Sequence, residues 1–284
     1  MNKVIVLGAG IMGAGVAQVV SEAGYTVVLK DVSEELVRLG LQTIDKNLSR
    51  DVEKGTISRA RKAEVLSAIR GTADQDELAR EAKDADLMIE AVGERVDMKT
   101  EVYAQLDGIC PPKTIFATNT SALSITELAA STQRTDRFIG LHFFNPVTVM
   151  QLVEVITGQD TSADTVEKSI EFVKSIGKVP VNVVEAPAFI VPRLLVPMIN
   201  EAAYMAAEGV ASYEDIDTAM RLGANHPIGP LALGDMIGLD VCLSVMETLQ
   251  RETGDPKYRP CPILRKLVRA GALGRKTGQG FYKY

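Results

Sequence analysis

Cysteine, histidine and long apolar runs are all scarce in this chain of 284 residues. Its three cysteines, Cys110, Cys242 and Cys261, are odd in number and far apart, which indicates free thiols in a reducing cytoplasm rather than a disulfide framework. No stretch approaches the roughly 20 apolar residues that a membrane span requires. A strand-like apolar run starts at Lys3, so we expect neither a cleaved leader nor membrane attachment.

Positive charge is also in deficit. The 31 basic and 37 acidic residues give a formal net charge of −6. That balance argues against a nucleic acid or an anionic membrane as partner, because both require clustered cations. The sequence contains no cysteine and histidine cluster with zinc-site spacing, no P-loop and no G-x-S-x-G elbow. We therefore expect no metal centre.

What the chain does contain, up to about residue 184, is an alternation of short apolar runs with helical segments. Helical periodicity is seen at 11–23, 99–109 and 165–176. The apolar runs predict strands at Val4–Leu7, Thr26–Leu29, Leu87–Ala91, Thr114–Ala117, Phe138–Leu141, Leu152–Ile156 and Val179–Val183. Continuous apolar runs separated by helices are typical of a largely parallel sheet covered on both faces, so the predicted class is doubly wound α/β.

Beyond Pro187 the strand signal disappears. Helical patterns follow at 188–208, 213–222, 235–252 and 262–270. We expect an α/β domain over residues 1–185 and an all-helical domain over residues 186–284. The long charged segment 33–69, interrupted by Gly55, predicts a helical hairpin inserted after the second strand.

Residues 8–13, Gly-Ala-Gly-Ile-Met-Gly, match G-x-G-x-x-G between a predicted strand and a predicted helix. The glycines permit a tight turn and a close approach to a pyrophosphate, which the helix N-terminus attracts. Asp31, after the second strand, can bind ribose hydroxyls and would repel a 2′-phosphate, so NAD is favoured, although Lys30 beside it leaves NADP open. This Rossmann-type motif predicts cofactor contacts at Gly8, Gly10, Ile11, Met12, Gly13 and Asp31.

The chain has only two histidines, His142 and His226. Hydride transfer from an alcohol also requires a proton carrier, and histidine suits that role near neutral pH. His142 follows a predicted strand and so lies at the carboxyl edge of the sheet, where doubly wound folds bind ligands. Glu154, on the expected neighbouring strand, can orient the imidazole. A structural histidine with a surface acid is the alternative, and His226 fits a turn residue.

Polar residues Asn119, Thr120 and Ser121 follow another predicted strand and gather at the same edge. They suit hydrogen bonding to a ligand. The alternative is a helix N-cap, although Ser124 or Thr126 can fill that role instead.

Several motifs together resemble those of the L-3-hydroxyacyl-CoA dehydrogenases, and the order in which they occur makes the resemblance specific. They are residues 8–13, Asn-Thr-Ser at 119–121, Gly-Leu-His-Phe-Phe-Asn-Pro at 140–146, Leu-Gly-Ala-Asn-His-Pro at 222–227, Gly-Asp-Met-Ile-Gly-Leu-Asp at 234–240 and Lys-Thr-Gly-Gln-Gly-Phe-Tyr at 276–282. The chain is most similar to the short bacterial branch, the 3-hydroxybutyryl-CoA dehydrogenases. The resemblance implies NAD(H)-dependent interconversion of (S)-3-hydroxybutyryl-CoA and acetoacetyl-CoA, in butyrate or fatty-acid metabolism.

The resemblance also implies roles for individual residues. His142 exchanges the proton of the 3-hydroxyl group, Glu154 pairs with His142, and Ser121 hydrogen-bonds the substrate oxygen. Arg50 and Lys54 fall where the family's hairpin supplies cations to the phosphates of coenzyme A; as bare residues they would indicate a solvated face. Positions that match family residues near the cofactor are Glu94, Lys99, Asn119, Asn145 and Lys276. A homodimer formed through the C-terminal helices, with the active site between the domains, is implied as well.

One departure from the family pattern is Pro192, which replaces an asparagine whose amide contributes to the substrate pocket. Proline lacks that amide and a backbone N–H, and we expect it in the first turn of a helix, where N–H groups are largely unpaired. Losing a substrate hydrogen bond costs about 1–3 kcal/mol, or roughly ten- to a hundred-fold in rate. An impaired NAD- and CoA-binding member is therefore one alternative. Another is a dehydrogenase of free hydroxy acids, which Arg50 and Lys54 disfavour.

Overall fold

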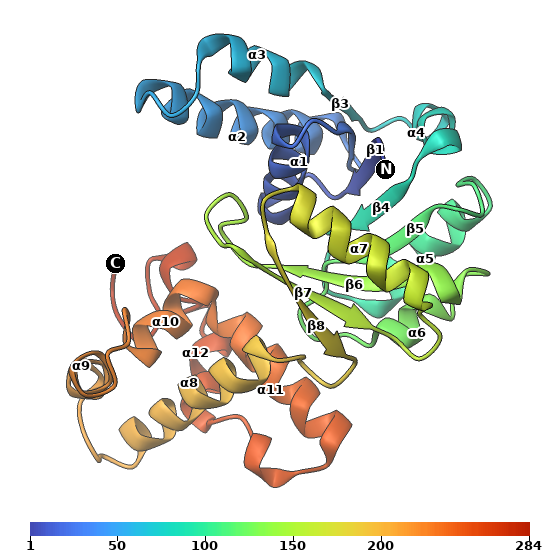
Figure 1. The fold of residues 1–284 in the computed structure, drawn as a ribbon. Helices are drawn as coiled ribbons and strands as arrows, with labels where there is room; N and C mark the ends of the chain where they lie inside the picture. The colour runs from blue at the N-terminus through green and yellow to red at the C-terminus, as the bar shows by residue number, and fades with distance from the viewer. The chain divides into compact units, whose positions relative to one another are not determined.

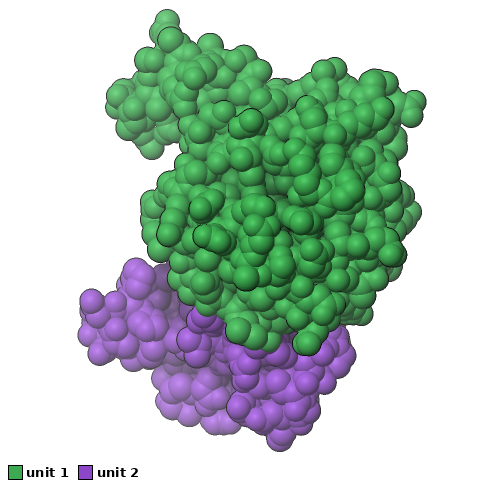
Figure 2. Space-filling model, turned by 45° about the vertical axis from the view of Figure 1, so that its right-hand side comes forward, with its two compact units in different colours: residues 1–185 green, residues 186–284 purple.

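The computed structural model describes residues 1–284, which form two compact units, Met1–Glu185 and Ala186–Tyr284 (Figure 2). None of the helices combines the length and the apolarity that crossing a bilayer requires.

The first unit is built on an eight-stranded sheet in the order β3-β2-β1-β4-β5-β6-β7-β8 (Figure 1). The bounds of the strands are β1 (Lys3–Leu7), β2 (Thr26–Lys30), β3 (Ile69–Thr72), β4 (Leu87–Glu90), β5 (Ile115–Thr118), β6 (Phe138–Phe143), β7 (Leu152–Thr157) and β8 (Val179–Val184). Neighbouring strands are parallel except β6 and β7, which are antiparallel. The strand order reverses at β1 and β4, which is the place where open α/β sheets bind ligands.

The strands form because their residues are β-branched or apolar and can be buried on both faces of the sheet. Val4, Val6, Leu29, Ile89 and Ile139 are buried completely in one apolar core. The helices of this unit are α1 (Ile11–Glu22), α2 (Glu34–Glu53), α3 (Arg59–Ser67), α4 (Gln75–Glu81), α5 (Val96–Asp107), α6 (Ile125–Ala129) and α7 (Ala163–Ser175). The predicted doubly wound class is confirmed.

The predicted hairpin is present as α2 and α3, which pack against each other between β2 and β3. Gly55, with φ of +72°, lies in the turn between them. The expected hairpin reaches too far, however, because its last residue begins β3. The segment 69–72, Ile-Arg-Gly-Thr, carries a single large apolar side chain, as befits a strand at the edge of the sheet, and so gives no strand signal.

The second unit is helical, with α8 (Val191–Ala207), α9 (Tyr213–Gly223), α10 (Pro230–Ile237), α11 (Leu239–Thr253) and α12 (Pro262–Arg269). The single helix predicted over 235–252 is wrong, because Gly238 has φ of +109° and separates α10 from α11. Short 3-10 turns occur at Ala82–Asp84, Thr135–Arg137, Pro256–Tyr258 and Arg275–Thr277.

Buried Asp235 fixes the end of the chain onto α10. Its carboxylate accepts hydrogen bonds from the backbone N–H groups of Phe281 and Tyr282, each at 2.9 Å. A Cβ at Gly280 would lie 1.9 Å from Oδ1 of Asp235, so only glycine fits there. Two of the sequence motifs, 234–240 and 276–282, therefore pack against each other.

Candidate active site

The glycine-rich turn 8–13 joins β1 to α1, and its glycines serve two different needs. A Cβ at Gly8 would lie 2.5 Å from the carbonyl oxygen of Ala91, and one at Gly13 would lie 1.7 Å from that of Gly8. Gly10 is exposed, and a Cβ there would meet nothing within 4 Å. The chain's own packing requires Gly8 and Gly13, whereas Gly10 keeps a space open above the turn.

The start of α1 faces that space. Its N-cap is Gly10, so no side chain caps the first N–H groups, and its first turn carries no acidic residue. Ile11 is 73% exposed although it is apolar. Uncapped N–H groups and the helix dipole together make a site for an anion such as a pyrophosphate.

Asp31 closes the turn from the side of β2. Its Oδ2 accepts from the N–H of Ala9 at 2.6 Å, and its Oδ1 accepts from the N–H of Val32 at 2.7 Å. The ammonium of Lys30 donates to the carbonyl oxygens of Asp31 and Ala73, and burial lowers the pKa of this lysine. Lys30 is thus hydrogen-bonded to the protein backbone, which removes the reason for keeping NADP as an alternative cofactor.

A hollow of about 120 Å³ lies beside Gly8 and Asp31. Its remaining walls are Leu7, Lys30, Val32, Gln75, Leu78, Val92, Val102, Gln105 and Leu106. A mostly apolar hollow beside a carboxylate and a glycine turn fits an adenosine group.

His142 and Glu154 face each other across β6 and β7. The antiparallel register places them directly opposite, and Nδ1 of His142 lies 2.7 Å from Oε2 of Glu154. The histidine is 5% exposed and the glutamate is completely buried. The predicted strand ended at Leu141, which placed His142 after it. Strand β6 extends to Phe143, so His142 lies within the strand instead.

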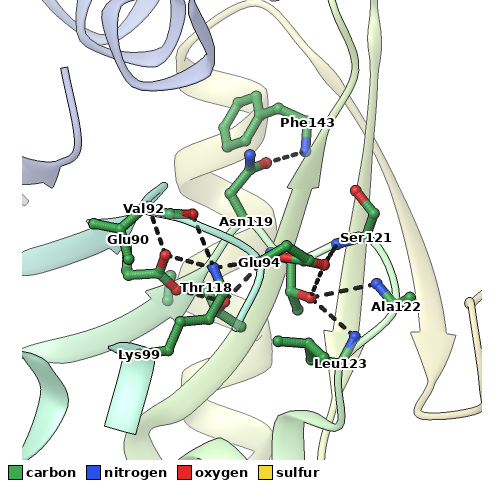
Figure 3. Close-up of polar contacts among 12 residues, drawn as sticks. Glu90, Val92, Glu94, Lys99, Thr118, Asn119, Ser121, Ala122, Leu123 and Phe143 are labelled. Atoms are coloured by element: carbon green, nitrogen blue, oxygen red, sulfur yellow. Dashed lines mark hydrogen bonds and ion pairs between the residues drawn. The ribbon is translucent and has the colours of Figure 1, made fainter. Parts of the chain in front are cut away.

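Residues 119–121 lie at the carboxyl edge of β5 (Figure 3). Oδ1 of Asn119 accepts from the N–H of Phe143 at 2.8 Å and so ties this segment to the end of β6. Oε1 of Glu94 accepts from the hydroxyl of Thr120 and from the N–H of Ser121 at 2.8 Å. Ser124 is the N-cap of α6, so the cap does not occupy Ser121.

A buried carboxylate that is not among the predicted site residues lies beneath this edge. Glu90 ends β4 and is completely buried, and its Oε1 accepts from the ammonium of Lys99 at 2.6 Å. The signal was available, because Glu90 is the only charged residue in an otherwise apolar predicted strand, and a buried charge requires a partner.

Lys178 is a second functional candidate that sequence patterns missed. Its ammonium donates to the carbonyl oxygens of Val147 and Met150 at 2.7 and 2.8 Å, and burial lowers its pKa. These bonds hold the loop 144–151 that follows His142. The loop also packs closely on α1, because a Cβ at Gly15 would lie 2.9 Å from the Cβ of Val147.

The hairpin cations and Asn145 meet in one cavity of about 380 Å³ in the first unit. Arg50 lies in the last turn of α2 and Lys54 is its C-cap; both are exposed. Asn145 and the residues after it line the opposite wall. The two cations predicted to bind coenzyme A thus line the same cavity as the loop that follows β6.

Lys276 and Pro192 belong to the second unit. The ammonium of Lys276 lies 2.6 and 2.7 Å from the two carboxylate oxygens of Asp240, and its cofactor contact stays a prediction. Pro192 is buried and is the second residue of α8, so its expected place in a first turn is confirmed. His226 lies in the turn after α9, where its N–H donates to Met220.

Comparison with known proteins identifies the family to which the chain belongs. Residues 3–186 match the NAD-binding domain of 3-hydroxyacyl-CoA dehydrogenase, and residues 189–284 match its C-terminal domain. The 3-hydroxybutyryl-CoA dehydrogenase of Clostridioides difficile is 53% identical, with 99% of both chains covered. The crystal structure of (S)-3-hydroxybutyryl-CoA dehydrogenase from Ralstonia eutropha is 49% identical, with a TM-score of 0.95 over 100% of this chain and 99% of that one. The chain therefore belongs to the 3-hydroxyacyl-CoA dehydrogenase family, and its first unit is the NAD-binding domain.

Proposed function

We propose that this enzyme catalyses the reversible, NAD(H)-dependent oxidation of (S)-3-hydroxybutyryl-CoA to acetoacetyl-CoA, in butyrate or fatty-acid metabolism. The observation that carries the proposal is the buried His142–Glu154 pair at the carboxyl edge of the sheet that holds the glycine-rich turn. Relatives about 50% identical over the full chain bear the name of this activity.

The residues of the first unit fit the cofactor. The start of α1 would hold the pyrophosphate, and Asp31 with the neighbouring hollow would hold the adenosine. Glu94, Lys99, Asn119, Asn145 and Lys276 are proposed to act near the nicotinamide half. When bound, NAD supplies the carbon that accepts the hydride.

The chain's own residues move the proton. Because Glu154 holds Nδ1 of His142, we assign Nε2 to proton exchange with the 3-hydroxyl group of the substrate. Glu154 stabilises the imidazolium that forms when the hydroxyl proton is taken. Ser121 hydrogen-bonds the same substrate oxygen and aligns it with the imidazole. Acid–base assistance of this kind contributes about 10²–10⁴-fold in rate.

Arg50 and Lys54 are proposed to bind the phosphates of the coenzyme A moiety. Their exposure at the end of α2 leaves both cations accessible to a large anion. This assignment distinguishes a thioester substrate from a free hydroxy acid, which lacks those phosphates.

Two further assignments complete the proposal. The enzyme works as a homodimer through its helical unit, and light scattering on the purified protein checks this. It works in the cytoplasm, where thiols stay reduced, which agrees with three cysteines that are all free.

The deciding experiment follows the loss of NADH absorbance with acetoacetyl-CoA as substrate, with NADPH and free acetoacetate as controls. We expect turnover that requires NADH and the thioester. Pro192→Asn is assayed beside it: comparable rates show that the asparagine is dispensable, whereas activity only in the variant identifies an impaired enzyme. The comparisons give no support to impairment. Turnover of acetoacetate alone contradicts the proposal.

A further inference from the structure

The backbone holds Lys178 in a fixed place between α7 and β8. Gly177, with φ of +72°, follows the end of α7, and the N–H of Lys178 donates to the carbonyl oxygen of Val173 at 3.1 Å, a bond of the kind that closes a Schellman motif. On the other side, the N–H of Val179 donates to the carbonyl oxygen of Gln151 at 2.8 Å. The side chain of Lys178 therefore starts from a fixed base beside the loop that precedes β7.

The ammonium of Lys178 is buried against two carbonyl oxygens of that loop. It donates to Val147 at 2.7 Å and to Met150 at 2.8 Å, and the residue is only 8% exposed. Burial lowers the pKa of this lysine, and the carboxylate of Glu22 acts in the opposite direction. Neither oxygen accepts a hydrogen bond from a backbone N–H group. A side chain without N–H groups at this position would leave both oxygens without that partner.

The loop contains one turn of its own, over residues 146–150. The N–H groups of Val149 and Met150 both donate to the carbonyl oxygen of Pro146 at 2.9 Å. Val147 is 4% exposed and packs against α1. Because the ammonium binds carbonyl oxygens near the beginning and at the end of this turn, it fixes the turn to the start of β8.

The same turn lines the cavity that holds the hairpin cations. Residues 145–149 form one wall of this space of about 380 Å³, and Arg50 and Lys54 belong to the other. The ladder between β6 and β7 sets His142 opposite Glu154 independently of the turn. The position of the turn therefore affects the width of the cavity more than it affects the proton-transfer pair.

We propose that Lys178 is a positioning residue for the substrate: it holds the turn 146–150 as one wall of the cavity that binds the coenzyme A moiety, and so lowers KM for acetoacetyl-CoA. This rests on the proposed function, in which Arg50 and Lys54 bind the phosphates of that moiety. Lys178 does not itself line the cavity, so its effect reaches the substrate through the turn.

Lys178→Met tests this role, because methionine keeps an unbranched side chain and removes the charge and the N–H groups. We expect KM for acetoacetyl-CoA to rise about tenfold, since the turn is no longer held in place. The value of kcat should stay within about threefold of that of the natural enzyme, because the ladder still sets His142. Steady-state rates at saturating NADH give both values, and calorimetry gives the dissociation constant of coenzyme A.

Two control variants on α7 separate this role from loss of charge and from loss of stability. Lys174→Met removes a charge from an exposed position and should change neither KM nor Tm. Thr165→Val removes a buried hydroxyl that donates to the carbonyl oxygen of Asp136 at 2.8 Å, so it should lower Tm and leave KM unchanged.

An unchanged KM in Lys178→Met overturns the proposal, because the variant then behaves like Thr165→Val. A fall in kcat of tenfold or more also overturns it, since Lys178 would then act on the reacting centre. If Lys178→Met does not fold, Lys178→Arg decides. Its longer, planar head group forces the two carbonyl oxygens to move, so KM should rise at least about threefold with kcat retained; an unchanged KM contradicts the role.

Failure of the proposed function gives a different result. A natural protein that binds coenzyme A but does not reduce acetoacetyl-CoA contradicts the proposed reaction and leaves the role of Lys178 to the binding measurement. A coenzyme A dissociation constant that rises about tenfold in Lys178→Met then supports the positioning role, and an equal constant in the two proteins overturns it.

Discussion

Glu154 is proposed to stabilise the charge that His142 gains when it takes a proton. Glu154→Gln keeps an oxygen that can accept from Nδ1 of His142 but removes the negative charge that stabilises the imidazolium. We expect kcat to fall about 10²-fold or more, with little change in the NADH dissociation constant. Steady-state rates check this beside Glu171→Gln on α7, which carries the same change on an exposed face. A Glu154→Gln enzyme within threefold of the natural kcat contradicts the role.

The three buried thiols predict how stability responds to alkali. Burial raises the pKa of Cys110 to about 11 and that of Cys242 to about 12, from an ordinary value of 9.0. Above about pH 9 the unfolded chain loses these protons while the folded chain keeps them, so the free energy of unfolding falls as the pH rises.

Urea unfolding at about pH 8.5 and pH 10.5 measures this loss, with Cys242→Ala as the comparison. We expect a smaller decrease in the variant, because one of the titrating thiols is absent. A thiol reagent should label none of the cysteines in the native protein near pH 8 and all of them after unfolding. Equal decreases in the two proteins contradict the assignment to Cys242.

Among single residues, sequence patterns predict the site residues that lie at strand ends and in motifs. His142 and residues 119–121 follow predicted apolar runs, which end at one edge of the sheet, and Glu154 lies on the strand predicted next to His142. Glu90 and Lys178 were missed because their roles depend on contacts between segments distant in sequence. The bonds from Lys178, the residue before β8, to Val147 and Met150 join it to a loop that no local pattern links to it.

At the scale of elements, the turn from β1 to α1 contains one glycine that the fold requires, Gly13, and one that we expect only cofactor binding to require, Gly10. Gly13→Ala would place a Cβ 1.7 Å from the carbonyl oxygen of Gly8 and force the turn apart. Gly10→Ala meets no protein atom, and its backbone, with φ of −68°, suits alanine.

We expect Gly10→Ala to change the free energy of unfolding by less than about 1 kcal/mol, because loss of a good N-cap offsets the reduced freedom of the unfolded chain. NADH binding should weaken at least tenfold, since the methyl group fills the space that a pyrophosphate needs. Gly13→Ala should lose both stability and binding. Urea unfolding and NADH fluorescence on the two variants give the comparison; unchanged NADH affinity in Gly10→Ala would place the pyrophosphate elsewhere.

Helices and strands were predicted correctly where the apolar pattern is strong. The prediction failed at a short edge strand and at a break between two helices that follow each other directly. The buried strands and the α2–α3 hairpin gave strong patterns. Edge strand β3 has too few apolar residues to show one. The break between α10 and α11 lies inside a continuous helical pattern, and the positive φ of Gly238 reveals it.

For the molecule as a whole, a net charge of −6 opposes a polyanionic substrate, so local cations must reverse that field near the site. Arg50→Glu/Lys54→Glu should raise KM for acetoacetyl-CoA about tenfold at low salt and leave KM for NADH unchanged. The difference from the natural enzyme should shrink at about 0.5 M salt, where screening acts over a few ångströms.

The matched control is Arg38→Glu/Lys46→Glu, which makes the same change in net charge at exposed positions of α2 that do not line the cavity. It should leave KM for acetoacetyl-CoA close to that of the natural enzyme. Equal increases of this KM in both double variants would show that overall charge causes the effect, and would contradict the proposed coenzyme A site at the end of α2.

The antiparallel pairing of β6 with β7 has a consequence for how this enzyme can diversify. Backbone hydrogen bonds of the ladder, and not the loop 144–151, set His142 opposite Glu154. An insertion in the loop preserves the proton-transfer pair, whereas one extra residue inside either strand turns a partner to the other face of the sheet. We therefore expect changes in the loop to alter substrate binding, through the cavity that it shares with Arg50 and Lys54, while the ladder keeps the proposed acid–base pair in place.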